Sequence, residues 1–219
     1  SVIRALRAAR KDLGPALGKL AYAAGLDYFG WRLSPESPTL AKRAYPRAWA
    51  PLIAHTAKRF NLDPNLLWAI MRTESVYRPD VISRVNAGGL MQLMPTTASR
   101  LANELKLKHF EAEDVFRPEI NLLLAGRYLQ AVSRKLHGQV PLIAAAYNGG
   151  PHNVARWLDY RGKGAAMDEF IEEIPFAESK RYAKKIVRLV ALYERTYCNK
   201  DDQVLPNALN TSYLPYPNF

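Results

Sequence analysis

Apolar residues along the chain recur with a helical period, and no alternating strand pattern persists. The pattern is clearest near the C-terminus, where one helix face carries Tyr182, Ile186, Leu189, Val190 and Tyr193. Together with the proline and glycine positions, it predicts helices at residues 46–60, 64–74, 95–105, 118–138, 141–147, 151–162 and 177–197. The sequence therefore predicts an all-α fold in which most connections are short.

The start and end of several predicted helices are marked by capping residues. Asp63 stands at an N-cap position and Pro64 follows at the first helical position. The run Asn148-Gly149-Gly150 ends the short apolar helix before it. The exception to short connections is a long loop expected from Ser75 to Pro95.

Three regions are expected along the chain. Residues 1–44 resemble two short basic helices broken near Gly14 and Gly30, with a connector at 34–38, and are expected to end a larger helical region. Residues 45–197 form the main domain, and residues 198–219 an irregular tail. The chain begins at Ser1 without an apolar signal-peptide core, from which we expect a processed or trimmed polypeptide.

The composition is that of a folded protein with a strong positive charge. Hydrophobic residues make up 48% of the chain, and the formal net charge is +11. Such a charge attracts nucleic acid, anionic lipid or acidic cell-wall polymer, although a solvated basic surface explains it equally well. No apolar run is long enough to predict a membrane-spanning helix.

Cysteine and histidine usage predicts neither a disulfide nor a metal site. Cys198 is the only cysteine, and it lies far in sequence from any histidine. The four histidines have no pair at ligand spacing: His55, His109, His137 and His152. We therefore expect no metal and no cofactor.

One glutamate is placed where a protonated carboxyl is expected. Glu74 shares a helix face with apolar Leu67, Ile70 and Met71, so it points towards the packed side. It also ends its helix, where the macrodipole disfavours negative charge. Both effects raise the pKa of Glu74 and favour a general acid. The alternative is an ordinary, partly exposed glutamate at a helix end.

The loop after Glu74 contains a block suited to ligand contact. Gly88 and Gly89 allow close backbone approach, and Gln92 supplies both a donor and an acceptor. Met91 and Met94 offer a pliable apolar wall, and we expect one of these two methionines to lie in the core.

Four blocks together resemble the soluble lytic transglycosylases, which have a goose-type lysozyme-like fold. The blocks are Leu62 to Ser75, Gly88 to Pro95 with Ser83 before it, Ala145 to Pro151, and Ile174-Pro175-Phe176 with Glu178 and Tyr182. The resemblance covers about residues 45–195, and the order and approximate spacing of the blocks make it specific.

The resemblance implies a role for each matching residue. Glu74 is implied to be the catalytic acid. The residues implied to bind substrate are Ser83, Gln92, Met94, Tyr147, Asn148, Glu178 and Tyr182. Three of them also suit purely structural roles, which stay open: Asn148 a helix stop, Tyr182 a core position and Glu178 a helix start. Trp157 is a further candidate for stacking on sugar faces.

Some positions depart from the pattern common in that family. Thr73 replaces a frequent glutamine, Tyr77 a usual phenylalanine, and Asn86 a frequent glycine. These changes affect the shape of the loop, so they bear on substrate preference more than on the chemistry.

The scarcity of acidic residues after Glu74 favours a reaction with one carboxyl. Asp80 is the only acidic residue between Glu74 and Glu104, whereas glycoside hydrolases generally use two. The resemblance implies non-hydrolytic cleavage of the bond between N-acetylmuramic acid and N-acetylglucosamine, with Glu74 acting as acid and then base. The products would carry 1,6-anhydromuramyl ends.

The implied partner is the peptidoglycan glycan strand, bound by a monomer in a Gram-negative periplasm, with no nucleic acid. Three alternatives stay open. The first is a lysozyme-like hydrolase with Asp80 as the water activator. The second is a peptidoglycan-binding protein without activity, and the third is a basic helical protein that binds nucleic acid.

Overall fold

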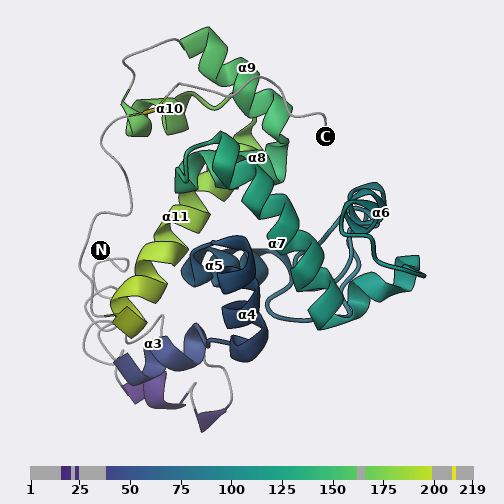
Figure 1. Ribbon diagram of the computed structural model, residues 1–219. Coiled ribbons are helices and arrows are strands. Elements are labelled where there is room, and N and C mark those ends of the chain that lie inside the picture. Colours follow the sequence, from purple (N-terminus) through teal and green to yellow (C-terminus); the bar gives the residue numbers. More distant parts are fainter. Residues whose placement is uncertain (1–15, 21–22, 25–37, 162–165, 199–208, 211–219) are drawn as a thin grey trace. The chain divides into compact units, whose positions relative to one another are not determined.

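The computed structural model describes residues 16–20, 23–24, 38–161, 166–198 and 209–210 (Figure 1). The predicted helix before Gly14, the predicted break near Gly30, the connector at 34–38 apart from Pro38, and most of the predicted tail lie outside these residues. Within the described residues the structure is helical, and the only strand-like pairing consists of isolated bridges. The fold is therefore all-α, as the periodicity predicted.

The chain divides into two units, Ser1–Ala48 with Tyr193–Lys200, and Trp49–Leu192 with Asp201–Phe219. In the smaller unit, α3 (Pro38–Ala44) precedes Tyr45. The ring of Tyr193 meets that of Tyr45 edge-on with centroids 6.4 Å apart. The Tyr197 hydroxyl donates a hydrogen bond of 3.0 Å to the Tyr45 carbonyl oxygen. These aromatic contacts form the core of the described part of this unit.

The larger unit holds the remaining helices. Their bounds are α4 Ala50–Phe60, α5 Pro64–Glu74, α6 Pro95–Glu104, the 3-10 helix η1 Ala112–Phe116, α7 Pro118–Lys135, α8 Val140–Gly149, α9 Pro151–Arg161, α10 Met167–Glu173 and α11 Ala177–Cys198. All but the last residues of α11 belong to this unit. Helix α7 packs against α4, α6, η1 and α8 and so connects most of the unit.

Three differences from the predicted helices have local causes. Helix α4 begins at Ala50 rather than at residue 46, because Trp49 before it has a left-handed backbone with φ 57°. Helices η1 and α10 were not predicted. Among their residues only Val115 in η1 and Met167, Phe170 and Ile171 in α10 are buried. Such short buried sets show no clear period.

Helix α5 forms the centre of the core. The Asp63 carboxylate accepts a hydrogen bond of 2.8 Å from the Asn65 amide, and Pro64 starts the helix, as predicted. Every residue from Asn65 to Met71 is buried. A helix buried on all sides cannot turn about its axis without opening the core. Glu74, the last residue of α5, is therefore held in a defined position.

The packing of α4 on α7 depends on a glycine. A Cβ atom at Gly126 would lie 2.5 Å from the Phe60 ring and 2.6 Å from the Thr56 methyl group. Gly126→Ala should therefore lower the free energy of unfolding by about 1–3 kcal/mol through overpacking. This is the opposite of the gain of roughly 1 kcal/mol expected for alanine in an open helix. Urea denaturation measures the difference, with Arg134→Ala on the exposed side of α7 as the control. A stabilised Gly126→Ala protein would contradict the packing argument.

Candidate active site

The candidate site is built around the carboxyl group of Glu74 at the end of α5. On the face of α5 that carries Glu74, Leu67, Ile70 and Met71 are fully buried. The Tyr182 hydroxyl of α11 donates a hydrogen bond of 2.5 Å to Glu74 Oε1. Tyr182 is thus a buried residue with a specific polar contact, and not only a core side chain.

Burial raises the pKa of Glu74 from 4.5 to about 7. Loss of solvent disfavours the carboxylate, and the charge of Glu178 adds to this effect. The hydrogen bond from Tyr182 and the positive charge of Lys185 act in the opposite direction, and burial prevails. At neutral pH, Glu74 therefore exists in both the protonated and the ionised form, as general acid and base catalysis requires.

Two stacked tyrosines cover one side of this carboxyl. The rings of Tyr147 and Tyr182 are nearly parallel, at 10°, with centroids 6.4 Å apart. Tyr128 meets Tyr147 edge-on at 5.5 Å. Burial first, and the Glu74 charge second, raise the pKa of both Tyr147 and Tyr182 well above the ordinary value. Both phenols therefore stay protonated and act as donors.

Asn148 and Glu178 meet where α8 ends and α11 begins. The Asn148 amide donates to the Glu178 carboxylate at 3.2 Å and accepts from the Ser179 hydroxyl at 2.8 Å. Gly149 must be small here, because a Cβ atom would lie 2.5 Å from Ser179 Oγ. A helix stop at Asn148 and a helix start at Glu178 are thus incomplete descriptions, since the two side chains also join their helices.

The loop residues Ser83 and Gln92 use their polar groups within the loop. Ser83 Oγ accepts a hydrogen bond of 2.9 Å from the Ala87 amide. Gln92 Nε2 donates to the carbonyl oxygens of Val81 and Gly89, each at 2.9 Å. These bonds give the loop its shape, and any contact of these side chains with a ligand stays a prediction.

The two methionines of the loop lie in different environments. Met91 is fully buried, whereas Met94 is 42% exposed and precedes α6. The prediction that one of the two belongs to the core is confirmed. The Met91 backbone also takes part in the site, because its carbonyl oxygen accepts a hydrogen bond of 2.6 Å from the Tyr147 hydroxyl.

Asn121 on α7 is a positioning residue that the sequence pattern did not predict. Its side chain accepts a hydrogen bond of 2.8 Å from the Met91 amide and donates to the carbonyl oxygens of Gly88 at 3.1 Å and Val115 at 2.8 Å. Gly89 passes so close that a Cβ atom there would lie 2.3 Å from Asn121 Nδ2. The available signal was an asparagine that shares a helix face with apolar Leu124 and Ala125.

Ser75 attaches the same loop to the end of α5. Its buried hydroxyl donates 2.8 Å to the Leu90 carbonyl oxygen and also lies 3.2 Å from the Met71 carbonyl oxygen. The loop after Glu74 is therefore connected to both α5 and α7 through buried hydrogen bonds.

Asp80 lies in an environment opposite to that of Glu74. Its side chain is 71% exposed and pairs with Arg78 at 3.4 Å. The hydrogen bond from Arg78 holds the pKa of Asp80 below its ordinary value. Asp80 is thus a hydrated carboxylate that forms a turn, as expected from its place after Arg78-Pro79.

Comparison with known proteins identifies the family. The model of the transglycosylase SLT domain matches residues 51–170. The chain belongs to this family.

Solved and curated relatives agree with the SLT domain. The chain is 30% identical to the soluble lytic murein transglycosylase of Escherichia coli over 74% of its own length. It is 31% identical to membrane-bound lytic murein transglycosylase C of Photorhabdus laumondii over 67% of its length. Among solved structures it superposes on an inactive glutamate-to-glutamine variant of lytic transglycosylase Slt from Pseudomonas aeruginosa, with a TM-score of 0.75, 27% identity and 93% of this chain covered.

The chain is much shorter than these relatives. It spans 26% of the Escherichia coli protein, 46% of the Photorhabdus protein and 33% of the solved Pseudomonas chain. The likeness therefore concerns the SLT domain, and what the larger proteins do as a whole is a separate question.

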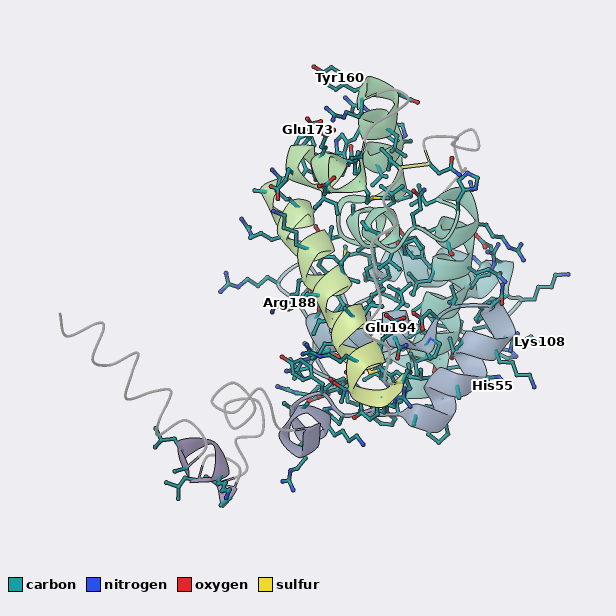
Figure 2. All side chains as sticks on the ribbon, turned by 90° about the vertical axis from the view of Figure 1, so that its left-hand side faces the viewer. His55, Lys108, Tyr160, Glu173, Arg188 and Glu194 are labelled. Atoms are coloured by element: carbon teal, nitrogen blue, oxygen red, sulfur yellow. The ribbon has the colours of Figure 1, made fainter. Side chains whose placement is uncertain are left out.

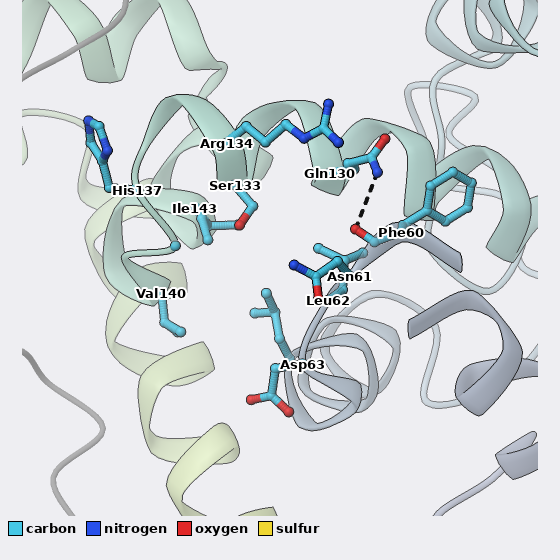
Figure 3. A pocket seen from close by; sticks show the side chains of 12 residues that line it. Phe60, Asn61, Leu62, Asp63, Gln130, Ser133, Arg134, His137, Val140 and Ile143 are labelled. Carbon is cyan, nitrogen blue, oxygen red and sulfur yellow. Dashed lines mark hydrogen bonds between the residues drawn. The ribbon is translucent and has the colours of Figure 1, made fainter. Parts of the chain in front are cut away.

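Two cavities of the SLT domain lie apart from Glu74. One, of about 430 Å³, lies at the opposite end of α5, and its lining includes Asp63 before α5 and Gln130, Arg134 and His137 of the α7 region (Figure 3). The α5 helix separates it from Glu74 by roughly 15 Å. The other, of about 1230 Å³, is lined by Trp157, Tyr160 and Phe176. Trp157 packs edge-on against Phe176 there at 5.2 Å, and its contact with sugar stays a prediction.

The raised pKa of Glu74 predicts how stability changes with pH. A carboxyl whose pKa is higher in the folded state binds its proton more tightly there than in the unfolded chain. The contribution of Glu74 to the free energy of unfolding is then fully present below pH 4.5 and is lost as the pH rises to about 7. Glu74→Gln should remove this loss, and it should stabilise the protein by as much as about 3 kcal/mol above neutral pH and much less in acid. Thermal denaturation across pH measures it, and a pH-independent difference would contradict the assignment.

The contacts of Asn121 predict a local effect on the loop. Asn121→Ala leaves the Met91 amide and two buried carbonyl oxygens without their partner, which should lower the free energy of unfolding by about 2–3 kcal/mol. Hydrogen exchange at the Met91 amide should become faster. Asn103→Ala on the exposed side of α6 is the control. Unchanged protection of the Met91 amide would show that Asn121 does not hold the loop.

Proposed function

We propose that this chain carries the catalytic domain of a lytic transglycosylase that cleaves the glycan strands of peptidoglycan. The observation that carries the proposal is the carboxyl of Glu74, which is largely desolvated, accepts a hydrogen bond from Tyr182 and has a pKa of about 7. Membership of the SLT family and the names of the relatives support the same activity.

The proposed reaction uses Glu74 twice. The protonated carboxyl first gives its proton to the oxygen that links N-acetylmuramic acid to N-acetylglucosamine, and the bond between that oxygen and muramyl C1 breaks. The muramyl N-acetyl carbonyl stabilises the positive charge that develops at C1. The Glu74 carboxylate then takes the proton of the muramyl C6 hydroxyl while that oxygen bonds to C1. Glu74 is protonated again, and no water is consumed.

Tyr182 makes the two steps compatible. Its hydroxyl donates to Glu74 Oε1, so the proton to be transferred is carried on the other carboxyl oxygen. The same bond stabilises the carboxylate that forms after proton transfer, and it limits the rise of the pKa of Glu74 that burial causes. Tyr182 therefore balances the acid and base functions of one group.

The position of Asp80 favours this reaction over hydrolysis. A hydrolase needs a second group to activate water or to form a glycosyl intermediate. Asp80 is exposed and forms an ion pair with Arg78. Its pKa is lowered, whereas that of Glu74 is raised. The Pseudomonas relative described as inactive differs by a glutamate-to-glutamine change, which is in keeping with one essential glutamate in that protein.

Substrate-binding roles follow from the places of the remaining residues. We assign sugar contacts to Tyr147, Asn148, Glu178 and Tyr182 beside Glu74, and to Ser83, Gln92 and Met94 from the loop. Ser83 and Gln92 are hydrogen-bonded within the loop, so they would affect sugar binding by fixing the shape of the loop. Met94 is exposed and could contact a sugar directly. These assignments follow the sequence prediction, and substitution of each residue can test them.

We also propose that the protein acts as a monomer in a Gram-negative periplasm and does not bind nucleic acid. The named relatives include both soluble and membrane-bound lytic murein transglycosylases. Among the helices that the structure describes, none has the length and apolar character to cross a bilayer.

Product analysis tests the function directly. Purified sacculi digested with the wild type should give muropeptides with 1,6-anhydromuramyl ends, detected by mass spectrometry. Glu74→Gln should abolish turnover while the far-UV spectrum stays helical, because the amide has no proton to donate. Activity of the wild type should decline above about pH 7, as the acid form of Glu74 is lost.

The matched control is Asp80→Asn, which removes the next acidic residue along the chain after Glu74. It should leave product type and rate within about twofold of the wild type, since an exposed ion pair contributes little. Reducing ends in place of anhydro ends, together with loss of activity in Asp80→Asn, would establish the hydrolase alternative.

A further inference from the structure

A row of cations follows the outer side of α11. Arg181, Lys185 and Arg188 are spaced four and three residues apart, so they share one face of the helix, and all three are exposed. We call these three residues the basic stripe. Figure 2 looks onto α11 and shows Arg188 extending outward from it. The buried side of the same helix carries Tyr182, Ile186 and Leu189.

The basic stripe lies next to the candidate active site. Lys185 is one turn after Tyr182, whose hydroxyl contacts Glu74. The charge of Lys185 lowers the pKa of Glu74. The pKa of Lys185 is itself lowered, first by burial and then by the charges of Arg72 and Arg188, while the charge of Glu74 raises it. A charge acts most strongly on the groups closest to it. Lys185 is therefore the residue of the basic stripe that lies near the Glu74 carboxyl, and Arg72 of α5 and Arg188 lie near Lys185.

The other lysines on this part of α11 have a different arrangement. Lys184 forms an ion pair of 2.5 Å with Glu172, and Lys180 donates to the Glu172 carbonyl oxygen. Within the described part of the chain, no residue of the basic stripe forms an ion pair with a carboxylate. Like charges that lie close together repel one another, so the arrangement has a cost that a bound anion would lower.

We infer that the basic stripe binds the carboxylates of the peptide stem on the muramyl residue whose bond is cleaved. The inference rests on the proposed function and concerns its substrate preference. In peptidoglycan the stem is attached to the lactyl group of the same muramic acid whose C1 must reach Glu74. The stem must therefore leave the site close to Glu74, and its acidic groups are complementary to the cations found there.

The geometry also defines the form of the contact. Arg181, Lys185 and Arg188 extend over two turns of α11, which is roughly 10 Å of helix. Two or more carboxylates of an extended stem can meet this length at once. Because the contacts are exposed, salt screens them, and the resulting preference for acidic stems decreases as the ionic strength rises.

The experiment compares two strands that differ only in charge. One is an uncrosslinked peptidoglycan strand with native stems, and the other is the same strand after its stem carboxyls have been converted to amides with carbodiimide and ammonia. KM is measured on both by release of anhydromuramyl ends, at a pH below 7 so that Glu74 is protonated. The wild type should have the lower KM on native stems.

The test variant is the triple substitution Arg181→Gln, Lys185→Gln and Arg188→Gln. Its ratio of KM on native strands to KM on amidated strands should rise about fivefold and approach unity, as expected for the loss of three exposed contacts. The control is Lys58→Gln, Lys108→Gln and Arg134→Gln, which removes three exposed cations from other segments and should keep the wild-type ratio.

The outcomes separate the inference from the proposed function. An unchanged ratio in the stripe variant, or an equal change in the control, would overturn the inference while anhydro ends still form. Absence of anhydro ends with the wild type on both strands would reject the proposed function, and the inference with it. Loss of the wild-type preference at high salt supports the inference further.

Discussion

The burial of one carboxyl group at the end of α5 is the constraint on which the site depends. Glu74 is desolvated by the surrounding core, so its protonated form is favoured until about neutral pH. One hydrogen bond, from Tyr182, prevents the acid from becoming too weak to ionise. This placement of Glu74 requires that α5 be fixed in the core, and α5 is fixed because it is buried from Asn65 to Met71. Core packing and acid chemistry are therefore two consequences of the same arrangement.

The segments around Glu74 are kept in place by buried polar contacts. Ser75 bonds to Leu90, and Asn121 bonds to Gly88 and Met91. The Met91 carbonyl oxygen in turn orients the Tyr147 hydroxyl, and the Tyr147 ring stacks on Tyr182. A continuous set of contacts thus runs from α7 through the loop to the Glu74 carboxyl. Such prior ordering lowers the cost of reaching a reactive geometry.

Helix α11 combines two functions on adjacent faces. Its inner face supplies Tyr182 to Glu74 and packs into the core, while its outer face carries the basic stripe. The positive charges oppose the rise of the pKa of Glu74, yet burial outweighs them. An acid and a cationic surface can therefore lie side by side. Asp80 shows the contrasting case, in which an exposed carboxylate paired with Arg78 keeps a low pKa and suits no acid role.

The sequence by itself determined the helical class, the start of α5 at Asp63-Pro64 and the apolar face that directs Glu74 inward, because these depend on local spacing and capping. Through family resemblance it also predicted that Tyr182 and Tyr147 belong to the site. Only the tertiary structure decided that the Tyr182 hydroxyl reaches Glu74, that Met91 and not Met94 is buried, and that Asn121 holds the loop. The short helices η1 and α10 were also found only in the tertiary structure. These features join residues far apart in the chain, and local periodicity carries no information about which distant faces meet.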